Sequence, residues 1–199
     1  MKTFNYHSAK DSKEATKLSS SSSVFLAGGM TTIPSIKLGL ATYKDIIDIK
    51  NIKKLSGINV SRKSVKIGAT TKHAEVANSK EIKKAIPSLA SLAEGIGDPQ
   101  VRNRGTIGGS IANNDPSADY PSACIALNAV INTTERKIEA SKFFKGMFET
   151  ALKQGELIES VKFEIPEKSS YQKYPNPASR YAIVGVYVCL LYTSDAADE

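Results

Sequence analysis

Hydrophobic positions along the chain change their spacing several times, which predicts a mixture of strands and helices. Short apolar or alternating runs are typical of strands. They occupy residues 24–26, 45–49, 58–60, 65–67, 129–133, 137–139 and 157–165. Capping residues and prolines at first turns predict helices between these runs. The predicted helices span 11–18, 34–40, 73–77, 79–86, 87–94 and 120–128. Because strands and helices do not alternate strictly, the order favours an α+β fold in which a second unit begins near Ile58.

Two segments of the chain are rich in glycine. The first is A-G-G-M-T (27–31), which directly follows the apolar run 24–26. The second, R-N-R-G-T-I-G-G-S-I-A-N-N-D-P-S-A-D-Y-P (102–121), is expected to be a long loop around a glycine turn. Glycine lets a backbone approach a ligand closely, and consecutive amides in a turn favour anions. Either segment alone also fits a plain tight turn, but the pair suggests a diphosphate held from two sides.

Composition narrows the function. The 199 residues are 41% hydrophobic, which is sufficient for a core. Only two cysteines, Cys124 and Cys189, are present and no C-x-x-C, so this chain holds neither a disulfide framework nor a four-thiolate cluster. The N-terminus lacks a signal-peptide pattern, and the longest apolar run, 182–192, is shorter than the roughly 20 residues that a membrane helix needs. We expect a cytoplasmic protein with no membrane span.

Net charge is +7, from 27 basic and 20 acidic residues. Such a balance is compatible with nucleic-acid binding. The lysines are scattered, however, and aromatic residues do not interleave with them. A solvated basic surface is therefore the favoured interpretation, and no nucleic-acid partner is expected.

The two glycine segments together resemble those of the FAD-binding subunit of the molybdenum hydroxylases, nearest to the medium subunit of aerobic carbon monoxide dehydrogenase and further from the flavin domain of xanthine dehydrogenase. The opening M-K-T-F-N-Y-H and the segments 143–158 and 171–186 fit the same branch. The resemblance implies a two-subdomain FAD-binding domain of the PCMH type over 1–175. It would comprise a small N-terminal α/β subdomain (1–57) and a larger mixed-sheet subdomain (58–175).

The chain is expected to end within a longer protein. Residues 176–188 are interpreted as the start of a truncated C-terminal domain. Residues 189–199 resemble an in-frame translation of a sequencing adapter and are left out of the functional argument.

The resemblance also implies the cofactor-binding residues. These are Ala27, Gly28, Gly29, Met30, Thr31, Thr106, Ile107, Gly108, Gly109, Ser110, Asp119 and Lys173. Backbone amides of the two glycine pairs would bind the phosphates of FAD. Hydroxyls of Thr31, Thr106 and Ser110 would add donors.

Single residues in this set keep two interpretations. Asp119 either accepts from an FAD hydroxyl or caps the helix that begins near Pro121. Lys173 either lies near the flavin ring, as a matching lysine does in the xanthine dehydrogenase flavin domain, or is a surface lysine. His73 is interpreted as an ordinary histidine on a helix surface. Met30 has no atom that attaches FAD covalently, so a non-covalent, dissociable FAD is expected.

No catalytic residue and no metal ligand set is expected in this chain. The implied function is an electron-transfer flavoprotein subunit of an oxidoreductase complex. An iron–sulfur small subunit and a molybdenum large subunit would be its partners, and a terminal acceptor would take the electrons. The alternative is a non-redox nucleotide-binding or assembly module. Neither the substrate of the large subunit nor the terminal acceptor follows from this sequence.

Overall fold

The structure is a computed structural model that describes residues 2–191. Its N-terminal part contains a small parallel sheet of order β1-β3-β2. The elements are β1 (Asn5–Ser8), α1 (Ser12–Leu18), β2 (Ser23–Leu26), α2 (Thr32–Lys37) and β3 (Asp45–Asp48). Helix α1 begins as predicted, because the Asp11 carboxylate accepts a hydrogen bond from the Glu14 amide at 2.8 Å. A small apolar cluster that includes Ile47 and Leu157 joins this sheet to the rest of the molecule.

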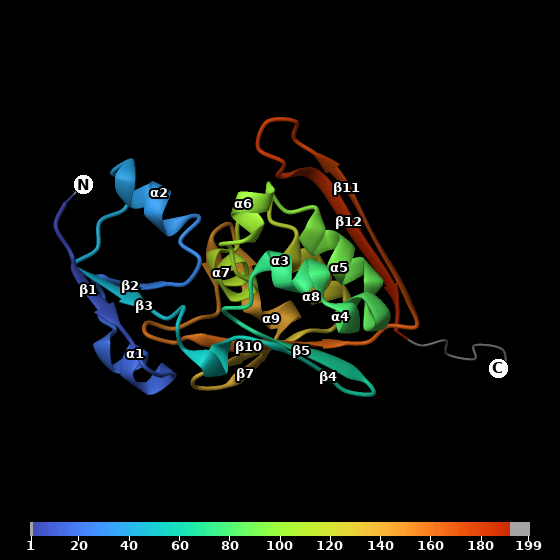
Figure 1. Cartoon of the computed structure of the whole chain (residues 1–199), viewed down its shortest axis with the longest axis horizontal. Helices are drawn as coiled ribbons and strands as arrows, with labels where there is room; N and C mark the ends of the chain where they lie inside the picture. Colours follow the sequence, from blue (N-terminus) through green and yellow to red (C-terminus); the bar gives the residue numbers. More distant parts are fainter. Residues whose placement is uncertain (1, 192–199) are drawn as a thin grey trace.

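The larger part is a five-stranded sheet of order β4-β5-β10-β6-β7, antiparallel at every described pair. Its strands are β4 (Ile58–Val60), β5 (Ser64–Gly68), β6 (Val130–Thr133), β7 (Lys137–Glu139) and β10 (Ile158–Glu164). Helices cover one face of this sheet (Figure 1). They are α3 (His73–Asn78), α4 (Lys80–Ala85), α5 (Pro87–Glu94), α7 (Ile107–Asn113) and α8 (Tyr120–Ala126).

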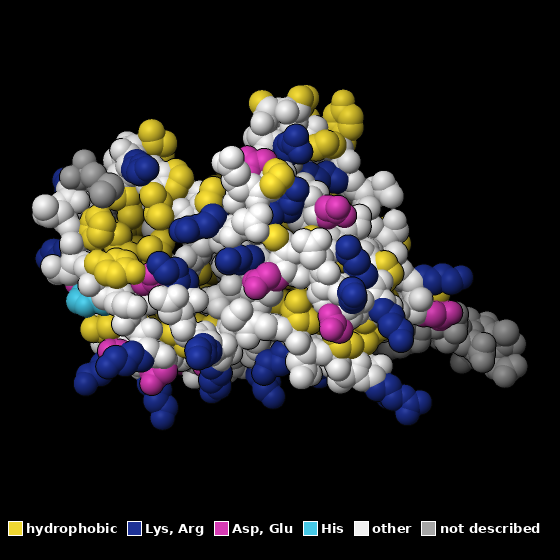
Figure 2. Space-filling view, viewed as in Figure 1, with side chains coloured by type: hydrophobic (Ala, Val, Ile, Leu, Met, Phe, Trp, Pro, Cys, Tyr) yellow, Lys and Arg dark blue, Asp and Glu magenta, His cyan; other side chains and the backbone are white. Residues whose placement is uncertain are grey.

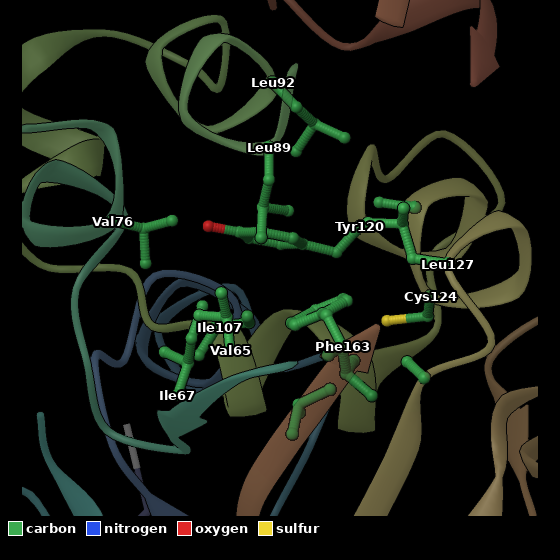
Figure 3. Close-up of a cluster of buried hydrophobic side chains, with 14 of the residues drawn as sticks. Val65, Ile67, Val76, Leu89, Leu92, Ile107, Tyr120, Cys124, Leu127 and Phe163 are labelled. Atoms are coloured by element: carbon green, nitrogen blue, oxygen red, sulfur yellow. The ribbon is translucent and has the colours of Figure 1, made fainter. Parts of the chain in front are cut away.

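The main core lies between these helices and the sheet. Tyr120 of α8 is fully buried among side chains such as Leu89, Ile107 and Phe163 (Figure 3). Along β10, Val161 and Phe163 point into this core while Lys162 between them is exposed. This alternation follows from the two-residue period of a strand and leaves the second face of the sheet polar.

A long antiparallel hairpin, β11 (Lys168–Pro175) with β12 (Ala182–Leu190), flanks α5 and α8 (Figure 1). The Tyr187 hydroxyl of β12 contacts the Ser88 hydroxyl of α5 at 2.5 Å, and the Cys189 thiol donates to the Ala126 carbonyl at 2.7 Å. The remaining elements are η1 (Lys53–Leu55), α6 (Pro99–Arg102), α9 (Ala140–Phe143), β8 (Phe144–Gly146) and β9 (Glu149–Thr150).

The α+β class is confirmed, and most predicted elements are present with ends that differ by up to three residues from the prediction. The larger sheet, expected to be mixed, is antiparallel over its described pairs. The expected long loop at 102–121 is wrong in part, because Gly108 and Gly109 lie in the first turn of α7, which Thr106 caps. Strand β11 was not predicted, since its residues are largely polar.

The boundary predicted at residue 175 falls at the end of β11, and 176–188 supplies the turn and most of β12. Of the segment 189–199, Cys189 and Leu190 complete β12. Residues 192–199 lie outside the described residues, so the adapter interpretation stays a prediction. Across residues 2–191, no helix combines the length and the apolar character that crossing a bilayer requires.

Candidate functional site

A cavity of about 360 Å³ lies between the small parallel sheet and the helical layer of the larger part. One wall comes from β2 and the segment after it, including Phe25, Gly28 and Thr31. The facing wall comes from the segment before α7 and from α7 itself, including Gly105 and Gly109. The cavity is therefore bordered by both glycine segments, although they are far apart in the sequence.

The two glycine segments are also in direct contact. A Cβ added at Gly28 would lie 2.2 Å from the carbonyl oxygen of Arg104 and 2.9 Å from Cα of Gly105. Distances below 3.0 Å are not tolerated between a Cβ and backbone atoms. Glycine at position 28 is thus required for the first segment to approach the second this closely.

The first segment presents unpaired donors. Among residues 2–191, no hydrogen-bond acceptor is found for the amide N–H groups of Gly28, Gly29, Met30 and Thr31. Gly29 has φ +75°, a left-handed conformation that favours glycine, and it turns the chain between β2 and α2. Successive free amides in such a turn form a concave site that suits an anion.

The second segment differs from the prediction. The Gly108 amide donates to the Ala69 carbonyl at 2.9 Å, and the Gly109 amide donates to the Thr106 hydroxyl at 3.2 Å. A Cβ at Gly108 would lie 2.5 Å from Cβ of Ala69, so this glycine serves packing of α7 against the turn after β5. The Gly108 amide is not a free donor, and the expectation that it binds phosphate is wrong in that respect.

Gly109 and Ser110 line the cavity, as residues that contact a ligand must. Gly109 is exposed, lines the cavity, and has the Thr106 hydroxyl as the nearest atom to an added Cβ. Ser110 lines the same wall. On this side of the cavity the available donors are therefore hydroxyl groups and the weakly held Gly109 amide rather than a row of free amides.

Asp119 lies at the edge of the cavity within a buried polar network. Its carboxylate accepts from the Tyr171 hydroxyl at 2.5 Å and forms an ion pair with the Lys173 ammonium at 2.9 Å. Lys173 also donates to the carbonyl of Gly95 at 3.0 Å. Burial, and then the hydrogen bond to Asp119, raise the pKa of Tyr171, which therefore remains a neutral donor.

This network corrects two interpretations. Asp119 stands at the start of α8 but makes no side-chain cap hydrogen bond, so the capping alternative is wrong. Lys173 is not a surface lysine, because its side chain is only 8% exposed. Its ammonium contacts Asp119 and does not line the cavity.

His73 is buried at the start of α3, contrary to its interpretation as a surface residue. It is 4% exposed, lines the cavity, and packs against Tyr120 with ring centroids 5.4 Å apart. A Cβ at Gly105 would lie 2.6 Å from its Nε2 atom. Burial, with a smaller contribution from the positive charge of Arg102, lowers the pKa of His73 to about 4. At neutral pH the imidazole is therefore uncharged.

Glu156 contributes a buried carboxylate to the cavity wall. Burial opposes its charged form, but hydrogen bonds from Arg136 and Thr133 outweigh this and lower the pKa of Glu156 to about 2. The Arg136 Nε lies 3.1 Å from the carboxylate. The pair links the segment before β10 to the turn between β6 and β7 and so fixes this wall.

Ten of the twelve predicted site residues line the cavity. They are Ala27, Gly28, Gly29, Met30, Thr31, Thr106, Gly108, Gly109, Ser110 and Asp119. The side chain of Ile107 instead points into the main core and is fully buried. Lys173 reaches the cavity only through Asp119.

Sequence reasoning missed the aromatic part of the lining, which comprises Phe25, Tyr43 and Tyr181. Tyr181 follows Arg180, whose φ of +59° marks the turn of the β11–β12 hairpin. The interpretation of 176–188 as the start of a further domain hides the role of this tyrosine. A search for aromatic residues at the ends of predicted strands would include it.

No group of three or more His, Cys, Asp or Glu side chains within residues 2–191 is arranged to hold a metal ion. The cavity instead offers donors for an anion, aromatic and aliphatic surface for a flat ring, and the carboxylates of Asp115, Asp119 and Glu156 as acceptors. Such a lining matches a long ligand that combines phosphate, hydroxyl and ring groups.

Comparison with known proteins gives one family over most of the chain. Residues 2–168 match the model of the FAD binding domain in molybdopterin dehydrogenase. The chain is 34% identical over 195 residues to the glyceraldehyde dehydrogenase medium chain of Sulfolobus acidocaldarius, with 94% of this chain and 69% of that protein covered. It is 35% identical to the carbon monoxide dehydrogenase medium chain of Hydrogenophaga pseudoflava, with the same coverage.

Solved structures agree with these matches. The chain superposes on a chain of reconstituted CO dehydrogenase from Oligotropha carboxidovorans with a TM-score of 0.91 at 31% identity, covering 96% of this chain and 71% of that one. A carbon monoxide dehydrogenase chain from Hydrogenophaga pseudoflava gives a TM-score of 0.88 at 34% identity, with coverage of 92% and 68%. The resemblance predicted from the two glycine segments is confirmed.

Proposed function

We propose, because this chain belongs to the family of FAD-binding domains in molybdopterin dehydrogenases, that it binds FAD in the cavity between its two glycine segments and passes electrons within a multi-subunit dehydrogenase. FAD is the cofactor of this family domain, and the related chains are subunits of dehydrogenase complexes. The binding residues, the electron route and the partner subunits are the proposed part.

The observation that carries the proposal is the contact between the two glycine segments, both of which line one cavity. Gly28 approaches the backbone of Arg104 and Gly105, and the four free amides of the first segment border the same space as Gly109 and Ser110. A pyrophosphate fits here, because the free amides supply donors and the hydroxyl-bearing residues Thr106 and Ser110 line the opposite wall. Hydrogen bonds to a charged acceptor contribute roughly 1.5–3 kcal/mol each.

The two walls of the cavity contribute different hydrogen-bond donors to the cofactor. Amides of Gly28 to Thr31 bind phosphate oxygens, while hydroxyls of Thr106 and Ser110 donate from the other side. Met30 is 39% exposed at the cavity, and its thioether forms no covalent bond to a flavin, so the cofactor is dissociable. Binding by amides and hydroxyls requires no arginine in the site.

Asp119 is the acceptor of the site. Tyr171 and Lys173 hold its carboxylate from the protein side, and its remaining lone pairs accept from a ligand hydroxyl. Lys173 adds positive charge behind this carboxylate, which moderates the negative field at the cavity. We assign to these residues the orientation of the cofactor rather than any proton transfer.

When bound, FAD supplies one-electron and two-electron chemistry, which suits transfer from iron–sulfur clusters of a small subunit to a terminal acceptor. The residues of this chain bind the cofactor, orient it and shield it from solvent. No acid or base is needed, in agreement with a His73 that is buried and neutral at pH 7.

The substrate of the complex is not set by this chain. Relatives of similar identity are named for glyceraldehyde, carbon monoxide and nicotine. Since one kind of domain serves such different compounds, we assign substrate choice to a molybdenum-containing large subunit.

The alternative is a nucleotide-binding or assembly module without redox function. Two results separate it from the proposal. The tagged chain is expressed with the large-subunit and small-subunit genes of its own genome, and the purified complex is given its reducing substrate without any acceptor. We expect three co-purifying chains, and we expect the visible flavin absorbance to bleach under substrate and return with an acceptor. A flavin that stays oxidised while the iron–sulfur signals are reduced supports the alternative.

A further inference from the structure

The outer face of the five-stranded sheet carries lysines without acidic partners. Lys66 on β5, Lys137 on β7 and Lys162 on β10 are exposed, and Lys54 of η1 lies beside them. None of these four takes part in an ion pair found within residues 2–191. Figure 2 shows Lys and Arg side chains projecting along the lower side of the molecule, beneath the sheet drawn in Figure 1.

Strand register brings two of these charges together. Lys66 is the direct cross-strand partner of Lys162 in the antiparallel pair β5–β10. The side chain on the other flank of Lys66 is Asn59, which is neutral. Like charges in directly opposite positions destabilise a sheet. The free chain therefore carries a repulsion that a bound anionic surface would relieve.

The same face is hollowed into an open groove of about 830 Å³. Three of the unpaired lysines, Lys54, Lys66 and Lys137, line it. The rest of the lining is mainly small and polar, namely Ser56, Gly57, Ile58, Asn59, Gly68, Asn132, Thr133, Thr134 and Ser160.

The other charged residues of the groove do not neutralise the positive charge of these three lysines. Glu135 is ion-paired with Lys153 at 3.4 Å, and Arg136 is engaged by the buried Glu156. Glu159 is the one further acidic residue of the lining. The groove is therefore positive and rich in hydrogen-bonding side chains.

We propose that this groove is the docking site for an acidic segment of a partner subunit, an assignment that rests on the proposed place of the chain in a multi-subunit dehydrogenase. A nucleic acid is disfavoured, because the lining has no aromatic side chain on which bases stack. A second copy of this chain is disfavoured, because the same face would bring lysines against lysines. Charge complementarity of this kind sets the rate and specificity of association.

The test compares two variants with the same change in net charge. Lys66→Glu/Lys137→Glu reverses the charge of two lysines in the groove. Lys13→Glu/Lys17→Glu reverses the charge of two exposed lysines of α1, which have no ion pair in the described chain. Fluorescein-labelled octaglutamate is titrated at low salt against the wild type and both variants. FAD affinity and thermal unfolding are measured on the same samples.

We expect the groove variant to bind octaglutamate about tenfold more weakly and the α1 variant to stay within about twofold of the wild type. Thermal stability should be unchanged or higher in the groove variant, because the carboxylate introduced by Lys66→Glu would face Lys162. Co-purification with the large and small subunits should fall in the groove variant alone.

An equal loss in both variants, or no binding of octaglutamate by the wild type, would overturn the proposal. So would an oligothymidine of matched charge that binds the wild type more tightly than octaglutamate. If the groove variant alone loses octaglutamate binding and the wild type binds no FAD, the result supports the groove and counts against the proposed cofactor role.

Discussion

Gly28 and Gly109 illustrate two different uses of a missing Cβ. Gly28 lets one chain segment lie against the backbone of another, whereas a Cβ at Gly109 would lie 2.9 Å from the Thr106 hydroxyl that accepts from the Gly109 amide. Gly108 belongs with Gly28, since it packs against Ala69. Of these three, Gly109 is the one that is exposed.

Replacing Gly28 by Ala should open the contact between the glycine segments. The new Cβ would lie 2.2 Å from the Arg104 carbonyl oxygen, and overpacking of this kind costs about 1–3 kcal/mol. We expect FAD affinity to fall at least about tenfold in fluorescence titration. The control is Gly95→Ala, where the nearest atom lies at 3.5 Å and φ is −77°. If Gly28→Ala binds FAD as well as this control, the contact has no role in binding.

Tyr171 should act on the cofactor through Asp119. Tyr171→Phe removes the hydroxyl that donates to the carboxylate at 2.5 Å, which costs about 1 kcal/mol of stability and frees the carboxylate to rotate. We expect a several-fold loss of FAD affinity by calorimetry. Tyr174→Phe on the same strand, where the side chain is 70% exposed, should leave both quantities unchanged. Equal affinities for the two variants would remove Tyr171 from the site.

His73 should make the fold sensitive to acid in a defined window. Its pKa is about 4 in the folded chain against an ordinary value of 6.5, so the unfolded chain binds the proton first as pH falls. The contribution of neutral His73 to the free energy of unfolding is complete above pH 6.5 and is lost as pH falls toward 4. This loss amounts to about 3 kcal/mol in total. Denaturant unfolding between pH 7 and pH 4.5 should show this slope in the wild type. His73→Leu should flatten this dependence of stability on pH. Glu156 contributes to the pH dependence only below this range, because folding lowers the pKa of Glu156 from 4.5 to about 2. An identical slope in both proteins assigns the effect to other groups.

Strand β12 presents opposite characters on its two faces. Tyr187 is 9% exposed and contacts Ser88, while Val186 and Val188 beside it are 52% and 61% exposed. Exposed apolar side chains on a two-stranded hairpin favour self-association.

Changing the two faces should therefore separate solubility from stability. Val186→Thr/Val188→Thr should reduce self-association in analytical ultracentrifugation with little change in the melting temperature. Tyr187→Ala should lower the free energy of unfolding by about 3–5 kcal/mol, because it leaves a cavity under the hairpin. Similar melting temperatures for the two variants would mean that the hairpin is not packed on α5.

Elements with local signals were predictable from the sequence. Ser79 caps α4, Pro87 opens α5, and the alternation at 157–165 contains β10. Strand β11 was not predictable, because its polar residues become a strand only by pairing with β12. The state of the Gly108 amide was hidden for a similar reason, since its acceptor Ala69 is distant in sequence.

The candidate site was predicted by composition rather than by geometry. The glycine segments identified the walls that border the cavity, and Asp119 marked its edge. Nothing local marked His73 as buried, because its burial arises from Tyr120 and Gly105, which arrive from other elements. Residues placed by long-range packing were the ones misjudged.

In the whole molecule, the small parallel sheet and the larger antiparallel part border one cavity. The central claim is that both glycine segments bind the pyrophosphate of one FAD there. The most direct measurement is competition at this site, with FAD bound to the full chain and displaced by either ADP or riboflavin. We predict one FAD per chain, released by ADP, which carries the diphosphate, and retained against riboflavin, which does not. Displacement by riboflavin with no effect of ADP would contradict the account, because binding would then depend on the ring and not on the two glycine segments.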